Sequence, residues 1–269
     1  MDIRAKTVLL AIVAAHLVAD FWLQGDDDVV AKKQFRLFAY LKHAVIHAMA
    51  AYSFAGLWFV WQIPAVVLVS HPLIDGLKEA SLRWLAPRDA DGKPVARWKF
   101  WTIIVDQALH VAVLAAMVAI FSFFDTISVE PYWSALLGNT LRLKTLVLLS
   151  GAIATILAGG VLVGILVQPL LQEIRDAYRS GGITPEQRGL ENGGRLIGQL
   201  ERALILLFIL SGQPMGVGFL IAAKSIFRFG ELKDNATRME AEYIIIGTML
   251  SFAWALAVVW LTHWAIAAV

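Results

Sequence analysis

Long apolar runs, separated by short polar stretches, are the main pattern in this chain of 269 residues, of which 59% are hydrophobic. An apolar run of about 20 residues is long enough to cross a bilayer as an α-helix. Eight apolar runs lie in the ranges Ala5–Leu23, Phe38–Trp61, Pro64–Leu85, Trp98–Phe124, Leu143–Leu171, Leu196–Leu210, Val217–Phe229 and Tyr243–Ala267, and the sixth and seventh of them are shorter than the others. The pattern therefore predicts an all-α, polytopic transmembrane helical bundle of about eight spans.

A polar stretch without Lys or Arg, from Asp125 to Asn139, interrupts the runs near the middle of the chain. We expect it to separate two halves. The first, residues 1–124, would form a four-helix bundle, and residues 125–142 would form a linker loop. Residues 143–269 would form a second transmembrane helical half.

Basic residues alternate between successive loops. The first loop contains Lys32, Lys33 and Arg36, the next loop contains neither Lys nor Arg, and the alternation continues along the chain. Because Lys and Arg collect in cytoplasmic loops, this predicts eight spans with both termini outside. Arg4 and Lys6 favour an N-terminus inside, and that conflict disappears if the first run does not fully cross the membrane.

Charge and cysteine content narrow the choice of partners. The net charge is +2 and no extended basic arm is present, so nothing indicates nucleic-acid binding. The chain has no cysteine, which excludes disulfides and thiolate ligands. We expect membrane lipids as neighbours, and any bound metal has to be held by imidazole and oxygen.

Five of the six histidines have a His or an Asp four positions away. The pairs are His16 and Asp20, His43 and His47, His71 and Asp75, and Asp106 and His110. Residues four apart share one face of a helix, which is how a single helix offers two ligands to one metal. Each pair falls in a different apolar run of the first half. The spacing therefore predicts a metal site inside the four-helix bundle with all eight residues as candidate ligands.

The predicted orientation sorts these residues by depth. The deeper layer is His16, His47, His71 and His110, and the layer nearer the cytoplasm is Asp20, His43, Asp75 and Asp106. The two layers would lie about 5.4 Å apart, which is one helical turn. His47 is then the most secure ligand, whereas His43 sits at the mouth and is placed to touch substrate or carry a proton.

The donor types indicate a divalent metal. Imidazoles suit zinc or iron, and carboxylates suit manganese or magnesium, so we expect zinc first, with manganese or iron as alternatives. Mixed His and Asp ligands also allow two metals. Three Asp within a bilayer cost about 2.5–3.5 kcal/mol each unless they are paired or metal-bound. Some of the eight residues would act as hydrogen-bonding partners of ligands rather than as ligands.

A second set of charges lies in the C-terminal half. Lys224 and Arg228 repel each other at this helical spacing unless they share an anion. That anion is either a lipid phosphate or one of Glu201 and Glu242, and we favour the internal ion pair slightly.

Several spaced motifs carry a family resemblance over about residues 5–124. They are His16-x-x-x-Asp20-Phe-x-Leu-Gln24, His43, His47, His71-Pro-x-x-Asp75, Lys78 and Asp106-Gln107-x-x-His110. The chain resembles the domain-of-unknown-function 3307 family of bacterial integral membrane proteins, which brings no established activity. It is also loosely similar to bacterial membrane proteins named as metal-dependent hydrolases. These resemblances imply a multi-pass protein of the bacterial cytoplasmic (inner) membrane, and they suggest hydrolysis as the reaction class.

The leading hypothesis is a metal-dependent membrane hydrolase that acts at the cytoplasmic interface on a lipid or lipid-linked phosphate. Asp20 or Asp106 would be the general base, and Lys78 would meet the anionic substrate. A transition-metal transporter is an alternative, although all eight residues lie toward one side of the membrane. A di-iron membrane oxidoreductase and a metal-stabilised scaffold or sensor are further alternatives. The sequence leaves the substrate and the oligomeric state open.

Overall fold

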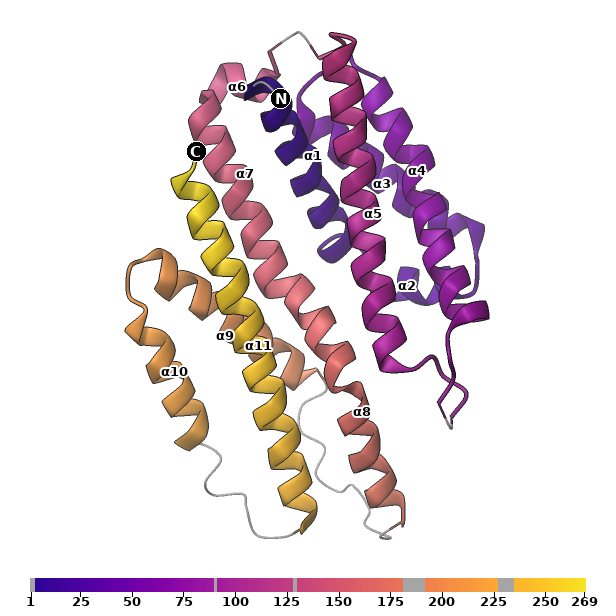
Figure 1. The fold of residues 1–269 in the computed structure, drawn as a ribbon, viewed down its shortest axis with the longest axis vertical. Coiled ribbons are helices and arrows are strands. Elements are labelled where there is room, and N and C mark those ends of the chain that lie inside the picture. The colour runs from indigo at the N-terminus through magenta and orange to yellow at the C-terminus, as the bar shows by residue number, and fades with distance from the viewer. Residues whose placement is uncertain (1–2, 90, 128–129, 181–191, 227–234) are drawn as a thin grey trace. The chain divides into compact units, whose positions relative to one another are not determined.

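The computed structural model describes residues 3–89, 91–127, 130–180, 192–226 and 235–269. Within these ranges the regular structure is helical, apart from one isolated bridge between Arg88 and Pro94. The α-helices in Figure 1 are α1 (Ile3–Phe21), α2 (Asp26–Lys33), α3 (Leu37–Ala55), α4 (Gln62–Ala80), α5 (Ala96–Phe123), α6 (Tyr132–Leu137), α7 (Asn139–Ile153), α8 (Gly159–Ser180), α9 (Gly193–Leu210), α10 (Met215–Ile226) and α11 (Asn235–Ala267). Short π-helical segments, Ser81–Leu85 and Ala154–Ala158, follow α4 and α7. The all-helical prediction is confirmed.

Three stretches are long and apolar enough to cross a membrane by themselves: Ala96–Phe123, Asn139–Tyr178 and Met239–Ala267. A fourth candidate is α1 together with α2, which pass the same test as a pair although an 86° bend separates them. These helices are consistent with a membrane protein.

Three local expectations were wrong. The polar stretch after the first apolar run contains helix α2, whose first turn has three Asp and whose last turn has two Lys, an arrangement that suits the helix dipole. Helix α3 ends at Ala55 instead of continuing to about Trp61, because Gly56 adopts a left-handed conformation with φ of 65°. Helix α8 continues to Ser180, beyond Leu171, where the predicted apolar run ends.

The chain divides into two compact units, residues 1–153 with 265–269 and residues 154–264. Helix α7 thus belongs to the first unit, and the division comes later in the chain than the predicted linker, which itself contains the short helix α6. Each unit is described separately below.

Helix α1 is the central element of the first unit and packs against α3, α5 and α7. Its buried face is rich in alanine, namely Ala5, Ala11, Ala14, Ala15 and Ala19. Small side chains let helix backbones approach closely, which is how helices pack where water does not drive association. One half of the unit is an apolar core around Val8, Ile12, Ile63 and Val118, and the other half contains the paired His and Asp residues.

Arg142 on α7 hydrogen-bonds to the last carbonyl groups of α3. Its guanidinium donates hydrogen bonds to the main-chain oxygens of Phe54 at 2.7 Å and Ala55 at 2.9 Å, and to Ser134 Oγ at 2.7 Å. The last carbonyls of a helix have no partner within the helix, so a buried cation beside them is stabilising. Gly56, the residue after α3, packs closely against Trp133, and a Cβ at this position would lie only 2.6 Å from the Trp133 side chain.

In the second unit, Arg202 fills a similar role at the π-helical segment. It donates to the Ile156 carbonyl at 2.8 Å and 3.0 Å and to Ser251 Oγ at 3.0 Å. Lys224 pairs with Glu201 at 2.7 Å, so the internal ion pair expected from the sequence is present. Arg228, which we expected to share this anion with Lys224, lies outside the described residues.

We predict that Arg142→Met destabilises the protein by about 2 kcal/mol, because it leaves two buried carbonyl groups without donors. Lys144→Met is the matched control, since Lys144 is exposed on the same helix. The measurement is the midpoint of unfolding in detergent. Equal midpoints for the two variants would contradict the role assigned to Arg142.

Candidate metal centre

Four helices of the first unit each contribute one His or Asp pair to a single cluster. Helix α1 supplies His16 and Asp20, α3 supplies His43 and His47, α4 supplies His71 and Asp75, and α5 supplies Asp106 and His110. All eight are buried except Asp20, whose side chain is 10% exposed. His47, the residue on which the prediction depended most, faces the interior and not the outer surface.

Asp20 is at the centre of the first group of candidate ligands. Its Oδ1 atom lies 3.0 Å from His43 Nε2, 3.1 Å from His47 Nε2 and 3.7 Å from His71 Nε2. One donor atom from each of these four residues falls within 4.8 Å of the others. Three imidazoles and one carboxylate converging at this distance could all bind one cation.

A second group, formed by His71, Asp75 and His110, also has its donor atoms within 4.8 Å of one another. His71 belongs to both groups, and its Nε2 lies 3.7 Å from Asp75 Oδ2. His110 Nδ1 lies 2.9 Å from the main-chain oxygen of Asp106. Because a carbonyl only accepts, Nδ1 carries the proton and Nε2 keeps its lone pair for a ligand role.

Three buried polar atoms in this cluster have no hydrogen-bond partner among the described residues: His71 Nε2, His110 Nε2 and Asp106 Oδ1. Buried polar atoms in native proteins are nearly always hydrogen-bonded, so each exception needs an explanation. Two imidazole nitrogens and a carboxylate oxygen are also typical metal ligands. The residues therefore fit a bound divalent cation better than a purely structural network.

The two predicted layers are in direct contact with each other. Within the deeper layer, the ring of His16 lies 4.8 Å from that of His110, 5.2 Å from that of His47 and 5.6 Å from that of His71, between centroids. The ring of His43 lies 4.4 Å from that of His47, and Asp20 Oδ1 contacts both. The cluster is thus one continuous site, and its depth in the membrane stays a prediction.

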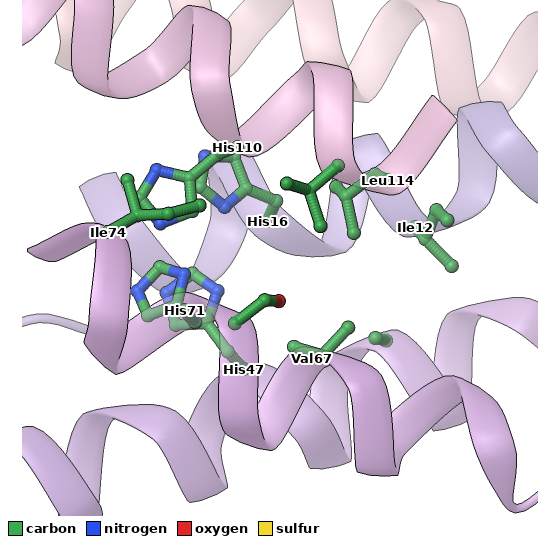
Figure 2. Close-up of a pocket in the computed structure, with 11 residues that line it drawn as sticks. Ile12, His16, His47, Val67, His71, Ile74, His110 and Leu114 are labelled. Carbon is green, nitrogen blue, oxygen red and sulfur yellow. The ribbon is translucent and has the colours of Figure 1, made fainter. Parts of the chain in front are cut away.

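Figure 2 shows the imidazoles at one end of a small cavity, with apolar side chains around the remainder. The lining consists of His16, His47, His71 and His110 together with Ile12, Ala51, Val67, Ser70, Ile74, Val113 and Leu114. A mostly apolar wall keeps the local dielectric low, which strengthens electrostatic interactions at the imidazole end.

Gln107 connects the parts of the cluster, a role that we did not predict although the residue belongs to one of the quoted motifs. Its Nε2 donates to Asp20 Oδ2 at 2.8 Å and to Asp106 Oδ2 at 3.2 Å, and its Oε1 lies 3.2 Å from His16 Nε2. The carboxylates fix the orientation of the amide, so Oε1 faces His16 and accepts its proton. His16 is therefore better placed to support the ligands than to bind metal through Nε2.

Two lysines also reach into the cluster. Lys32, which we placed in a solvated loop, is buried, and its Nζ lies 2.5 Å from Asp75 Oδ2. Lys78 Nζ lies 2.8 Å from Asp75 Oδ1 and 3.5 Å from Asp106 Oδ2. The ammonium of Lys78, predicted to meet an anionic substrate, thus contacts two carboxylates of the cluster.

Comparison with known proteins places this site within a family. Residues 8–136 match a family described as "Protein of unknown function (DUF3307)". This part of the chain belongs to that family. The predicted family is therefore confirmed, and the matched residues contain all four His and Asp pairs. No curated protein and no solved structure matches the chain.

The DUF3307 region thus holds a buried donor cluster, and Asp20 is the least buried of its eight His and Asp residues. Gln24, just after α1, places its Nε2 3.3 Å from His43 Nε2. Gln24 and His43 connect the buried ligands to the less buried end of the cluster, where Asp20 is partly exposed.

We predict that purified protein contains a divalent metal and that His71→Ala removes most of it, because His71 belongs to both candidate ligand groups. The measurement is elemental analysis of metal per chain. His263→Ala is the matched control, since His263 is exposed on α11 and is the one histidine outside the cluster. Metal-free wild-type protein, or equal metal in the two variants, would contradict a metal centre here.

Proposed function

We propose that this protein is an integral membrane metal-dependent enzyme that hydrolyses a lipid or lipid-linked phosphate at the cytoplasmic membrane interface. Its centre would be the four-helix bundle of α1, α3, α4 and α5. One observation carries the proposal: His71 Nε2 and His110 Nε2 are buried without hydrogen-bond partners, beside carboxylates and further imidazoles.

The donor set favours zinc. Asp20, His43, His47 and His71 would supply three imidazole nitrogens and one carboxylate oxygen, a combination that suits zinc and also accepts iron or manganese. A divalent ion at this position would polarise a phosphoryl oxygen and lower the pKa of bound water toward about 7. This chemistry is what phosphate-ester hydrolysis requires.

Other residues of the cluster would act as general base and hold the carboxylates in position. Asp20 is among the ligands, whereas Asp106 Oδ1 is buried and without a hydrogen-bond partner, so Asp106 is the better general base. His43, which the sequence suggested as a proton carrier, would instead be a ligand, because its Nε2 is the atom that faces Asp20. Gln107 holds Asp20 and Asp106 in position.

The compactness of the cluster weighs against the transporter alternative. A transport path needs polar groups along the direction of travel. In the described residues, the cavity next to the imidazoles is lined by apolar side chains such as Ile12, Val67 and Leu114. A di-iron oxidoreductase remains a second candidate, because two ligand groups share His71.

We further propose that the protein crosses the bacterial inner membrane about eight times with both termini outside. The three apolar stretches and the α1–α2 pair support part of this arrangement. The shorter helices α3 and α4 would contribute spans by packing in a bundle, because their His and Asp residues are buried in the cluster and do not face the lipid.

We predict that the metal-loaded protein releases phosphate from a lipid-linked phosphate, and that Asp106→Asn lowers kcat by about 10²–10⁴-fold while metal content is retained. Asp27→Asn is the control, since Asp27 is exposed on α2. The assay measures inorganic phosphate from detergent-solubilised protein.

Three results would contradict the proposed hydrolase function or favour one of its alternatives. No release by metal-loaded wild-type protein from a panel of lipid phosphates would contradict the hydrolase. Retained iron with a visible absorption band would favour the oxidoreductase. Metal uptake into proteoliposomes would favour transport.

A further inference from the structure

Asp75 differs from the other candidate ligands because both of its carboxylate oxygens already face a cation. Lys32 Nζ lies 2.5 Å from Oδ2, and Lys78 Nζ lies 2.8 Å from Oδ1. Lys32 is buried, and its main-chain oxygen accepts a hydrogen bond from Tyr40 Oη at 3.1 Å, which anchors the end of α2. The lysine beside Asp75 is therefore part of the folded site.

Asp20, the carboxylate of the first ligand group, has a different set of neighbours. Its Oδ1 faces the Nε2 atoms of His43 and His47, and its Oδ2 accepts from the amide of Gln107. No lysine or arginine of the described residues forms an ion pair with it. The two ligand groups thus differ in one respect that decides metal affinity, because only the second already contains fixed positive charge.

The shared histidine adds a second constraint. His71 Nε2 lies 3.7 Å from Asp20 Oδ1 and 3.7 Å from Asp75 Oδ2. An unprotonated ring nitrogen has one lone pair, so Nε2 can bind an ion in only one of the two groups. If it serves the first group, the second group keeps Asp75 and His110 with two ammonium groups beside the carboxylate.

Formal charge leads to the same conclusion. Asp20, Asp75 and Asp106 with Lys32 and Lys78 leave one negative charge when the histidines are neutral. A single divalent ion turns this into one positive charge, and a second ion would raise it to three positive charges. A buried, largely apolar site tolerates the first state far better than the second.

We propose that the site binds a single divalent ion, at Asp20, His43, His47 and His71, and that the ammonium of Lys32 takes the place of a second ion beside Asp75. This inference rests on the metal centre of the proposed function. It makes the centre mononuclear, which favours hydrolysis over di-iron chemistry. The residual positive charge also suits an anionic substrate such as a phosphate monoester.

The test is metal stoichiometry. Wild-type protein equilibrated with excess Mn²⁺ and desalted should retain about one ion per chain, with the electron paramagnetic resonance signal of isolated Mn²⁺. Lys32→Met should raise the ratio to about two and broaden the signal through coupling between neighbouring ions, because it frees Asp75 Oδ2. Met keeps the length and packing of the side chain while removing its charge.

Lys33→Met is the matched control, since Lys33 is the adjacent lysine of α2 and is exposed. It should behave as the wild type. Lys78→Met, which frees Asp75 Oδ1, provides a second variant if Lys32→Met does not fold, and it should also bind the additional ion.

The outcomes separate this inference from the proposed function. Wild-type protein with two coupled ions, or a ratio of about one in both Lys32→Met and Lys78→Met, would overturn the role of Lys32 but leave a metal enzyme in place. Wild-type protein that retains no ion at all would instead remove the metal centre on which both proposals rest.

Discussion

The whole first unit depends on one constraint: polar groups buried among apolar helices must satisfy one another. Four helices each bury two polar side chains one turn apart, and a helix presents residues at this spacing on the same face. The alanine-rich face of α1 brings the other helices close enough for all eight groups to meet. Leaving any of them unpaired in such surroundings is costly, and His71 Nε2, which is buried without a hydrogen-bond partner, is the atom at which the proposed ion would remove that cost.

The same constraint explains where the buried cations lie. Lys32 and Lys78 neutralise Asp75, Arg142 covers the last carbonyls of α3, and in the second unit Arg202 covers a carbonyl of the π-helical segment. Each is paired with oxygen atoms of the same unit. The arginines are structural because every acceptor they face is protein backbone or hydroxyl. The lysines differ, because their acceptor is a candidate metal ligand, and this places them in the chemistry of the site.

The sequence was sufficient to predict the helical fold, the family and the convergence of the four pairs, because helical spacing is local and appears directly in the order of residues. Contacts between distant segments were not predictable in the same way. Lys32 appeared to belong to a solvated loop, since nothing nearby in the sequence shows that α2 turns back toward Asp75 on α4. Gln107 and Arg142 were overlooked for the same reason, because their partners lie on other helices. The end of α3 was also missed, although a glycine at the position after a helix is a known stop signal.

X-ray absorption at the metal edge of the purified protein tests the central claim most directly, because it reports the atoms bound to the ion itself. A metal held by the cluster should show a first shell of nitrogen and oxygen at about 2.0–2.2 Å, with the outer-shell scattering of several imidazole rings. His71→Ala should weaken the imidazole scattering, and His263→Ala should leave it unchanged. A spectrum with oxygen neighbours and no imidazole scattering would show that the metal is bound elsewhere and would contradict the account.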